Sequence, residues 1–83
     1  MVEKGFNSDI SVRGFQYHIQ TEDWGAEYQY IMTKVFRNGE VVRSFKTTYK
    51  DIDYGGRGDP QVLRLALREQ HHQILDLLSA DQV

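Results

Sequence analysis

The sequence predicts an α+β two-layer domain, in which a three- to four-stranded antiparallel meander is followed by one C-terminal helix packed on one face. Apolar and polar residues alternate with period two through the first 50 residues, which is typical of half-buried strands. Leucine and isoleucine recur at helical spacing after residue 60. All ten aromatic residues lie at or before Tyr54, so the aliphatic C-terminal segment differs in composition from the predicted sheet.

The first two strands are predicted on either side of a tight turn. Apolar residues alternate with polar ones as far as Val12, and the alternation resumes in a shifted phase from Phe15 to Ile19. Such a phase shift is expected where a two-residue turn joins two short strands. We therefore place a turn at Arg13-Gly14.

A second hairpin is predicted around Asn38-Gly39. Thr21–Glu27 is rich in charge and is expected to be a loop, whereas Tyr28–Arg37 resumes β-branched and aromatic character. Asn-Gly between two such segments is the strongest short-range hairpin signal, because both central positions of a type I′ turn need positive φ.

The turn also predicts which side chains share a face. One face carries the pairs Phe36 with Val41, Lys34 with Arg43, Met32 with Phe45, Tyr30 with Thr47, and Tyr28 with Tyr49. The other face carries Ile31, Thr33 and Val35 against Lys46, Ser44 and Val42. Phe15, Tyr17 and Ile19 are expected on the aromatic face and His18 on the other, although a slip of one residue in that pairing reverses this assignment.

The C-terminal helix is expected from about Pro60 to Ser79. Asp51–Gly58 carries three glycines and is predicted to link sheet and helix, and Asp59-Pro60 is a typical helix start. The apolar stripe is thin where it passes through Gln70 and His71. We expect a single domain over 1–83, with the sheet at about 8–50, the linker at 51–58 and the helix at about 60–79.

Size and composition exclude several classes of protein. The 83 residues contain no cysteine and have a formal charge of −2, so disulfides and zinc-thiolate sites are absent and a secreted mini-protein is disfavoured. No apolar run approaches the ~18 residues of a membrane span, and Met1–Ile10 is too polar for a signal peptide. A cytoplasmic location and no membrane partner are expected.

The leading functional hypothesis concerns the sheet face that one helix leaves uncovered. The aliphatic helix is expected to cover the aromatic face, so that an aliphatic patch remains exposed on the other. The interaction candidates are Ile31, Val35, Val42, His18 and Lys46. They predict a non-enzymatic module that binds a second copy of itself or another protein.

Nucleic-acid binding is the alternative hypothesis. Residues 31–50 hold five basic side chains and one acid, and basic groups beside aromatics can bind single-stranded nucleic acid. The candidates are Lys34, Arg37, Arg43 and Lys46. The same charges are also typical of an edge strand kept soluble, and the negative total charge counts against binding of a polyanion.

The sequence predicts no metal site and no cofactor. His72 and Asp76 have the i,i+4 spacing of metal ligands, but the adjacent His71 points about 100° away from His72 on a helix. We expect a solvated His72 and a partly buried, hydrogen-bonded His71. Gly55–Gly58 before the helix is similar to an anion site, although Asp59 would occupy that position.

Catalytic residues are likewise not predicted. His18 and Glu22 could serve acid–base chemistry, but a chain this small rarely encloses the pocket that catalysis requires. The polar segment that follows is expected to be structural, with Asp23 accepting hydrogen bonds from nearby backbone N–H groups.

Several segments of the chain together resemble a protein family. Its residues are Tyr17-His18-Ile19-Gln20-Thr21-Glu22-Asp23, Ile31-Met32-Thr33-Lys34-Val35-Phe36, Gly39, Lys46, Tyr49 and Gln70-His71. Together they resemble a small family of uncharacterised bacterial proteins over roughly residues 12 to 80. The Tyr-His-Ile-Gln-Thr-Glu-Asp run is its most specific part. The resemblance implies a bacterial origin and no particular activity.

Overall fold

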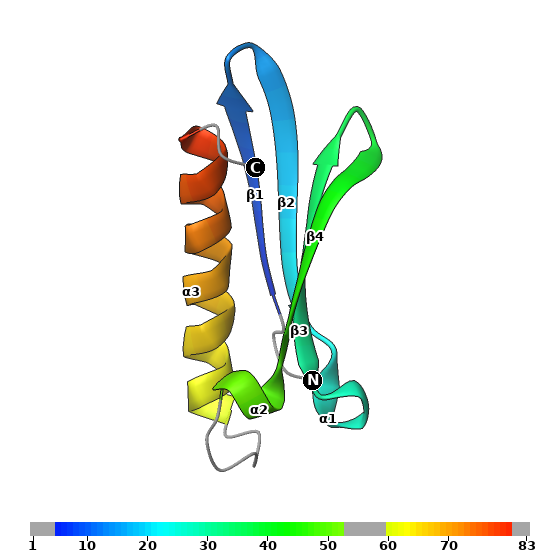
Figure 1. Ribbon diagram of the computed structural model, residues 1–83, viewed down its shortest axis with the longest axis vertical. Helices are drawn as coiled ribbons and strands as arrows, with labels where there is room; N and C mark the ends of the chain where they lie inside the picture. The colour runs from blue at the N-terminus through cyan, green and yellow to red at the C-terminus, as the bar shows by residue number, and fades with distance from the viewer. Residues whose placement is uncertain (1–4, 53–59, 81–83) are drawn as a thin grey trace.

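The computed structural model describes residues 5–52 and 60–80, which form a four-stranded antiparallel sheet with one long helix beside it (Figure 1). The elements in chain order are β1 (Gly5–Val12), β2 (Phe15–Asp23), α1 (Gly25–Tyr28), β3 (Tyr30–Arg37), β4 (Glu40–Thr48), α2 (Tyr49–Ile52) and α3 (Pro60–Ser79). The strand order β1-β2-β3-β4 is a simple meander. The predicted α+β fold with one C-terminal helix is confirmed.

Both predicted two-residue turns are present. Arg13 and Gly14 have φ of 53° and 84°, and Asn38 and Gly39 have φ of 56° and 80°. These left-handed values match the right-handed twist of the strands on either side. The predicted loop at 21–27 is wrong in part, because β2 continues to Asp23 and a short helix, α1, follows it.

A β-bulge changes the faces of β4 from those predicted. Arg37 pairs with Glu40 and Phe36 with Val41, as a two-residue turn requires, but the next pair is Val35 with Arg43. Val42 is thus an extra residue on β4. Because side chains alternate between the faces of a strand, one extra residue moves the rest of the strand to the opposite face.

The bulge changes which residues of β3 and β4 pair with each other. Lys34 pairs with Ser44 rather than Arg43, and Met32 pairs with Lys46 rather than Phe45. On the other side of β3, the connection from β2 is also shorter than the predicted loop at 21–27, because β2 ends at Asp23 and β3 begins at Tyr30. The pairs there are Ile19 with Val35 and Asp23 with Ile31.

The helix covers the face that was expected to stay open. It packs on β1 and β2 and reaches β3, and Ile19, Val35 and Ile31 are at most 1% exposed beneath it. The expectation that α3 covers the aromatic face is therefore wrong. The reason is the β2–β3 pairing, which sets Ile19 beside Val35. Phe15, Tyr17 and Ile19 thus share the face of Ile31 and Val35, and His18 lies on the face of Tyr30, the reverse of the predicted assignment.

Two apolar clusters lie between α3 and the sheet. One contains Ile19, Val35, Ile74 and Leu78, and the other contains Ile31, Tyr49, Leu63 and Leu67. The helix ends agree with the prediction, since α3 runs from Pro60 to Ser79. The predicted end of the sheet at about 50 and the start of the linker at 51 are wrong, because Tyr49–Ile52 forms α2; the rest of the linker and the Asp59 cap fall on 53–59, outside the described residues.

A buried polar layer separates the two clusters. The Thr21 hydroxyl lies 2.7 Å from the Thr33 hydroxyl and 2.8 Å from Nδ1 of His71, and Nε2 of His71 lies 2.8 Å from the Ser8 hydroxyl. The Gln70 amide donates to Thr33 at 2.9 Å. Every buried side-chain polar atom in the described ranges has a hydrogen-bond partner. The expectation of a buried, hydrogen-bonded His71 is confirmed.

Candidate binding site on the open face of the sheet

The face of the sheet opposite α3, called the open face below, is defined by strand alternation. On β2, Ile19 and Thr21 point toward α3, so His18, Gln20 and Glu22 point away from it. On β3 the same alternation assigns four residues to the open face, namely Tyr30, Met32, Lys34 and Phe36. The β4 residues paired beside them are Val41, Ser44, Lys46 and Thr48.

Three aromatic side chains form a cluster at one end of the open face. The ring of Trp24 stacks on that of Tyr30 with centroids 5.3 Å apart, and Tyr28 meets Trp24 edge-on at 5.7 Å. Trp24 is 36% exposed and Tyr28 is 57% exposed. Large aromatic groups that remain accessible in this way are well suited to contact another molecule.

The cluster is held by the segment that follows β2. Asp23 Oδ1 accepts a hydrogen bond from Gly25 N at 2.9 Å and another from the Tyr49 hydroxyl. The backbone N–H of Trp24 donates to the Tyr30 carbonyl at 3.0 Å. The prediction that Asp23 accepts from a backbone N–H group is confirmed, and the carboxylate also ties α1 to α2.

Tyr49 belongs to the core below this end of the sheet. Its side chain is buried, and its backbone N–H donates to the carbonyl of Gln29 at 2.8 Å. Burial, and next the hydrogen bond to the Asp23 carboxylate, raises the pKa of the Tyr49 hydroxyl well above its usual value. The hydroxyl therefore remains a donor at all physiological pH values.

Two lysines extend over the aromatic rings. Lys34 Nζ lies 5.7 Å from the Trp24 ring centroid, and Lys46 Nζ lies 4.7 Å from that of Tyr30. An ammonium group over the face of an aromatic ring is attracted by the ring quadrupole. The aromatic cluster and the two lysines thus form one continuous surface.

The four basic residues predicted for nucleic-acid binding do not lie on one face of the sheet. Lys34 and Lys46 lie on the open face, whereas Arg43 belongs to the α3 side of the sheet. There its guanidinium lies 5.4 Å from the Phe45 ring centroid, and that of Arg37 lies 4.8 Å from the ring centroid of Phe15.

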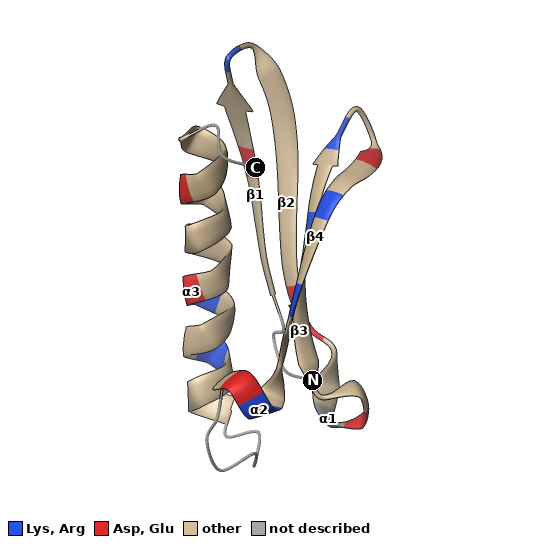
Figure 2. Cartoon of the chain, in the orientation of Figure 1, with Lys and Arg blue, Asp and Glu red and all other residues tan. Residues whose placement is uncertain are grey.

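Opposite charges occupy opposite halves of the open face. The carboxylates of Asp9 and Glu22 belong to β1 and β2, and the ammonium groups of Lys34 and Lys46 belong to β3 and β4 (Figure 2). Glu22 pairs with Met32, which in turn pairs with Lys46, so these three residues form one row across the strands.

His18 lies at the other end of the open face. Its Nδ1–H donates to Asp9 at 2.8 Å, and its Nε2 accepts from the Gln20 amide at 3.1 Å. A shallow pocket of about 480 Å³ opens here, lined by Asp9, Gln16, Tyr17, His18, Gln20, Phe36, Asn38 and Gly39. Both ring nitrogens of His18 are therefore engaged by neighbouring side chains.

The interaction candidates from the sequence separate into three groups. Ile31 and Val35 lie under α3 and are unavailable, which corrects the predicted aliphatic patch. Val42 is the bulge residue and is 42% exposed. His18 and Lys46 are on the uncovered face, but that face is the one of Tyr30 and Met32 and not the predicted face of Ile31 and Val35.

Sequence reasoning missed Trp24 and Tyr28, which it placed in a loop and in the core. Their signal was the occurrence of a tryptophan within a charged segment that lacks period-two alternation. Within ranges 5–52 and 60–80, His, Asp and Glu form no group of three or more that could hold a metal ion.

Comparison of the chain with protein-family models, with curated proteins and with solved structures finds no match in any of the three. No helix among the described residues has the length and apolar character needed to cross a membrane.

Proposed function

We propose that this chain is a non-enzymatic protein-interaction module that forms a homodimer through the open face of its sheet. One observation carries the proposal: Trp24 and Tyr28 are exposed on the sheet face that α3 leaves uncovered. Tryptophan and tyrosine are enriched in protein interfaces and dominate their energetic centres.

The size of the open face supports a dimer. Four strands of eight or nine residues, at ~4.8 Å between strands and ~3.3 Å per residue, cover a projected area of roughly 500 Å². Side-chain relief and α1 add to this area. The sum approaches the ~800 Å² per partner of a standard interface.

The charge pattern favours a second copy over an unrelated partner. A two-fold axis parallel to the strands would lay β1 and β2 of one copy over β4 and β3 of the other. Each Glu22 would then face the half that carries Lys34 and Lys46. This arrangement pairs opposite charges twice in one interface, as a symmetric contact requires.

Sedimentation velocity between about 1 and 100 µM tests this proposal, and wild-type protein is expected to form a dimer in that range. Glu22→Lys and Lys46→Glu should each weaken the dimer at least tenfold, and the double exchange should restore most of the loss. Arg43→Glu is the matched control, because Arg43 lies on the α3 side. A strict monomer at 100 µM, or equal weakening by the control, would refute the proposal.

Single-stranded nucleic acid is the second candidate, because Lys34 and Lys46 adjoin the stacked rings of Trp24 and Tyr30. Trp24 is the sole tryptophan in the chain, so its fluorescence reports binding of oligothymidylate directly. Binding should fall with added salt and with Lys46→Ala, and should persist in Arg37→Ala. Unchanged fluorescence at low salt would eliminate this candidate.

A further inference from the structure

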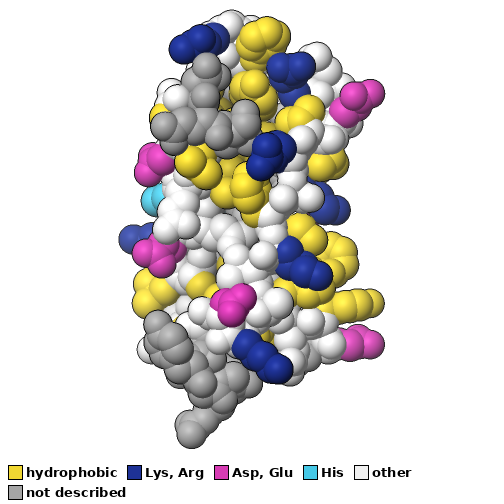
Figure 3. Space-filling model, viewed as in Figure 1, with side chains coloured by type: hydrophobic (Ala, Val, Ile, Leu, Met, Phe, Trp, Pro, Cys, Tyr) yellow, Lys and Arg dark blue, Asp and Glu magenta, His cyan; other side chains and the backbone are white. Residues whose placement is uncertain are grey.

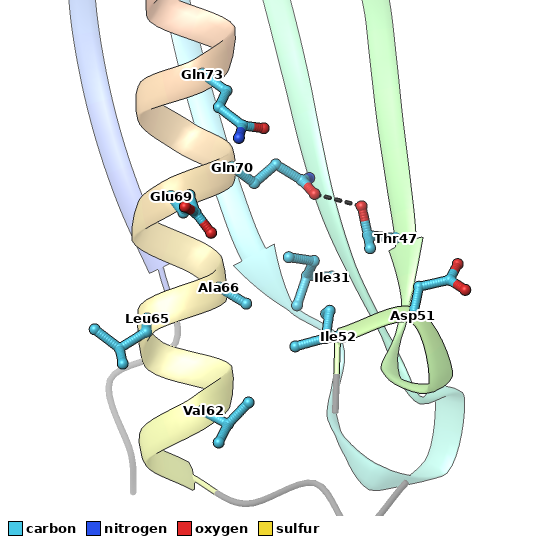
Figure 4. A pocket seen from close by; sticks show the side chains of 10 residues that line it. All are labelled: Ile31, Thr47, Asp51, Ile52, Val62, Leu65, Ala66, Glu69, Gln70 and Gln73. Carbon is cyan, nitrogen blue, oxygen red and sulfur yellow. Dashed lines mark hydrogen bonds between the residues drawn. The ribbon is translucent and has the colours of Figure 1, made fainter. Parts of the chain in front are cut away.

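A groove runs along the α3 side of the sheet, between α3 and β4. The helix packs on β1 and β2, and within residues 5–52 and 60–80 no second long helix covers the side of β4 that faces α3. Hydrophobic side chains are visible in this groove (Figure 3). Near α2 the groove deepens into a pocket of about 410 Å³ (Figure 4).

The lower part of the pocket is apolar. Ile31, which is 1% exposed, lies at its base, and Ile52 of α2 faces Val62 and Ala66 of α3 across it. Leu65 lies on the rim and is 63% exposed, although leucine is a residue that normally avoids water. This region can remove an apolar side chain from water.

The upper part of the pocket is polar and rigid. The Thr47 hydroxyl donates to the side-chain oxygen of Gln70, which links β4 to α3 across the groove. The amide nitrogen of Gln70 is engaged by Thr33. The bridge fixes the separation of the two walls, so the pocket is preformed.

The rim carries negative charge. Asp51 and Glu69 both line the pocket, and no lysine or arginine belongs to the described lining residues; Glu69 is exposed on α3, whereas the Asp51 carboxylate points away from α3 and also accepts a hydrogen bond from the Thr48 hydroxyl. The pocket is therefore complementary to a ligand that carries positive charge beside an apolar group. The apolar group would fit the lower part of the pocket, and the positive charge would lie at the rim.

We propose that this pocket binds an apolar side chain from a segment of a partner protein that carries lysine or arginine next to it. A volume of about 410 Å³ admits a large side chain, and the groove gives the flanking chain a path out of the pocket. The site lies on the face opposite the dimer surface and is independent of it. The module can thus hold a basic partner and a second copy at once.

Two synthetic peptides test the charge preference. One is acetyl-Lys-Lys-Trp-Lys-Lys-amide, and the other replaces each lysine with glutamate. Titration into ¹⁵N-labelled protein should shift the backbone amides of Ile52, Ala66 and Glu69 with the basic peptide. The acidic peptide should bind at least tenfold more weakly.

Substitutions then locate the site. Glu69→Lys with Asp51→Lys should reverse the preference between the peptides, and Ala66→Phe should abolish binding by filling the pocket. Asp76→Lys is the matched control, because it changes an α3 carboxylate outside this pocket and should leave binding unchanged.

Three results would overturn the proposal. They are equal affinity for both peptides, amide shifts confined to the aromatic cluster on the open face, and equal loss of binding in the Asp76→Lys control. If Ala66→Phe does not fold, the exposed Glu69→Lys variant alone decides the outcome, since a basic peptide that binds it unchanged contradicts the inference.

Discussion

Replacement of Thr21 by valine tests the buried polar layer directly. Thr21 is fully buried, and its hydroxyl joins Thr33 on β3 to His71 on α3. Valine has nearly the same shape, so the substitution removes two hydrogen bonds without opening a cavity. Nδ1 of His71 and the Thr33 hydroxyl each lose a partner that water cannot replace.

The expected magnitude follows from these two groups. A buried polar group left unpaired costs about 1–3 kcal/mol, and Thr33 keeps its bond from Gln70, so we expect a total loss of about 3 kcal/mol. A domain of this size is stable by roughly 4–12 kcal/mol, and the loss should lower Tm by on the order of 15 °C.

Urea unfolding at pH 7.5 and equal protein concentration measures the effect. Thr48→Val is the matched control, because it removes the same hydroxyl from an exposed bond to Asp51 and should change stability by less than about 0.5 kcal/mol. If Thr21→Val lowers the free energy of unfolding by as little as the control does, the layer is not dry and fully hydrogen-bonded, and the reasoning is refuted.

Three further perturbations give distinct outcomes. Burial, and next the neighbouring His72, lowers the pKa of His71, so the folded chain binds a proton less readily than the unfolded chain, whose histidine has a pKa near 6.5. Stability measured by urea unfolding should therefore be fully present above about pH 6.5 and fall toward pH 5.5, much less steeply in His71→Gln and only slightly less steeply in His72→Gln, because burial is the larger cause of the lowered pKa. Gly39→Ala should cost about 1–2 kcal/mol in thermal unfolding because φ is 80°, and an unchanged Tm would contradict the turn geometry. Tyr49→Phe should cost about 1.5–3 kcal/mol by losing a hydrogen bond to the Asp23 carboxylate, and in Asp23→Asn the ultraviolet titration of Tyr49 should move to lower pH.

Local signals in the sequence were sufficient for the strands, both turns and α3, but not for the short helices α1 and α2. The period-two alternation, the positive-φ dipeptides at Arg13-Gly14 and Asn38-Gly39, and the apolar stripe after Pro60 predict the strands, both turns and α3. Each of these signals is encoded within a few residues. The thin point of that stripe also predicted His71 as a buried, hydrogen-bonded residue.

The candidate binding site could not be predicted in the same way from local signals. The bulge at Val42 has no glycine or other local marker, yet it moves Lys46 to the face of Tyr30 and Phe45 to the face of Val35. The exposed pair Trp24 and Tyr28 could be recognised only after the face covered by α3 was known.

The sequence by itself determined that a meander of aromatic-rich strands precedes an aliphatic helix, because period and turn chemistry are local properties. The tertiary structure alone decided which face the helix covers. That choice depends on the pairing of Ile19 with Val35, which are distant in the sequence, and on one unpaired residue in β4, which no local residue signal marks. Because strand side chains alternate, a shift of a single residue exchanges core and surface, and with them the residues available for binding.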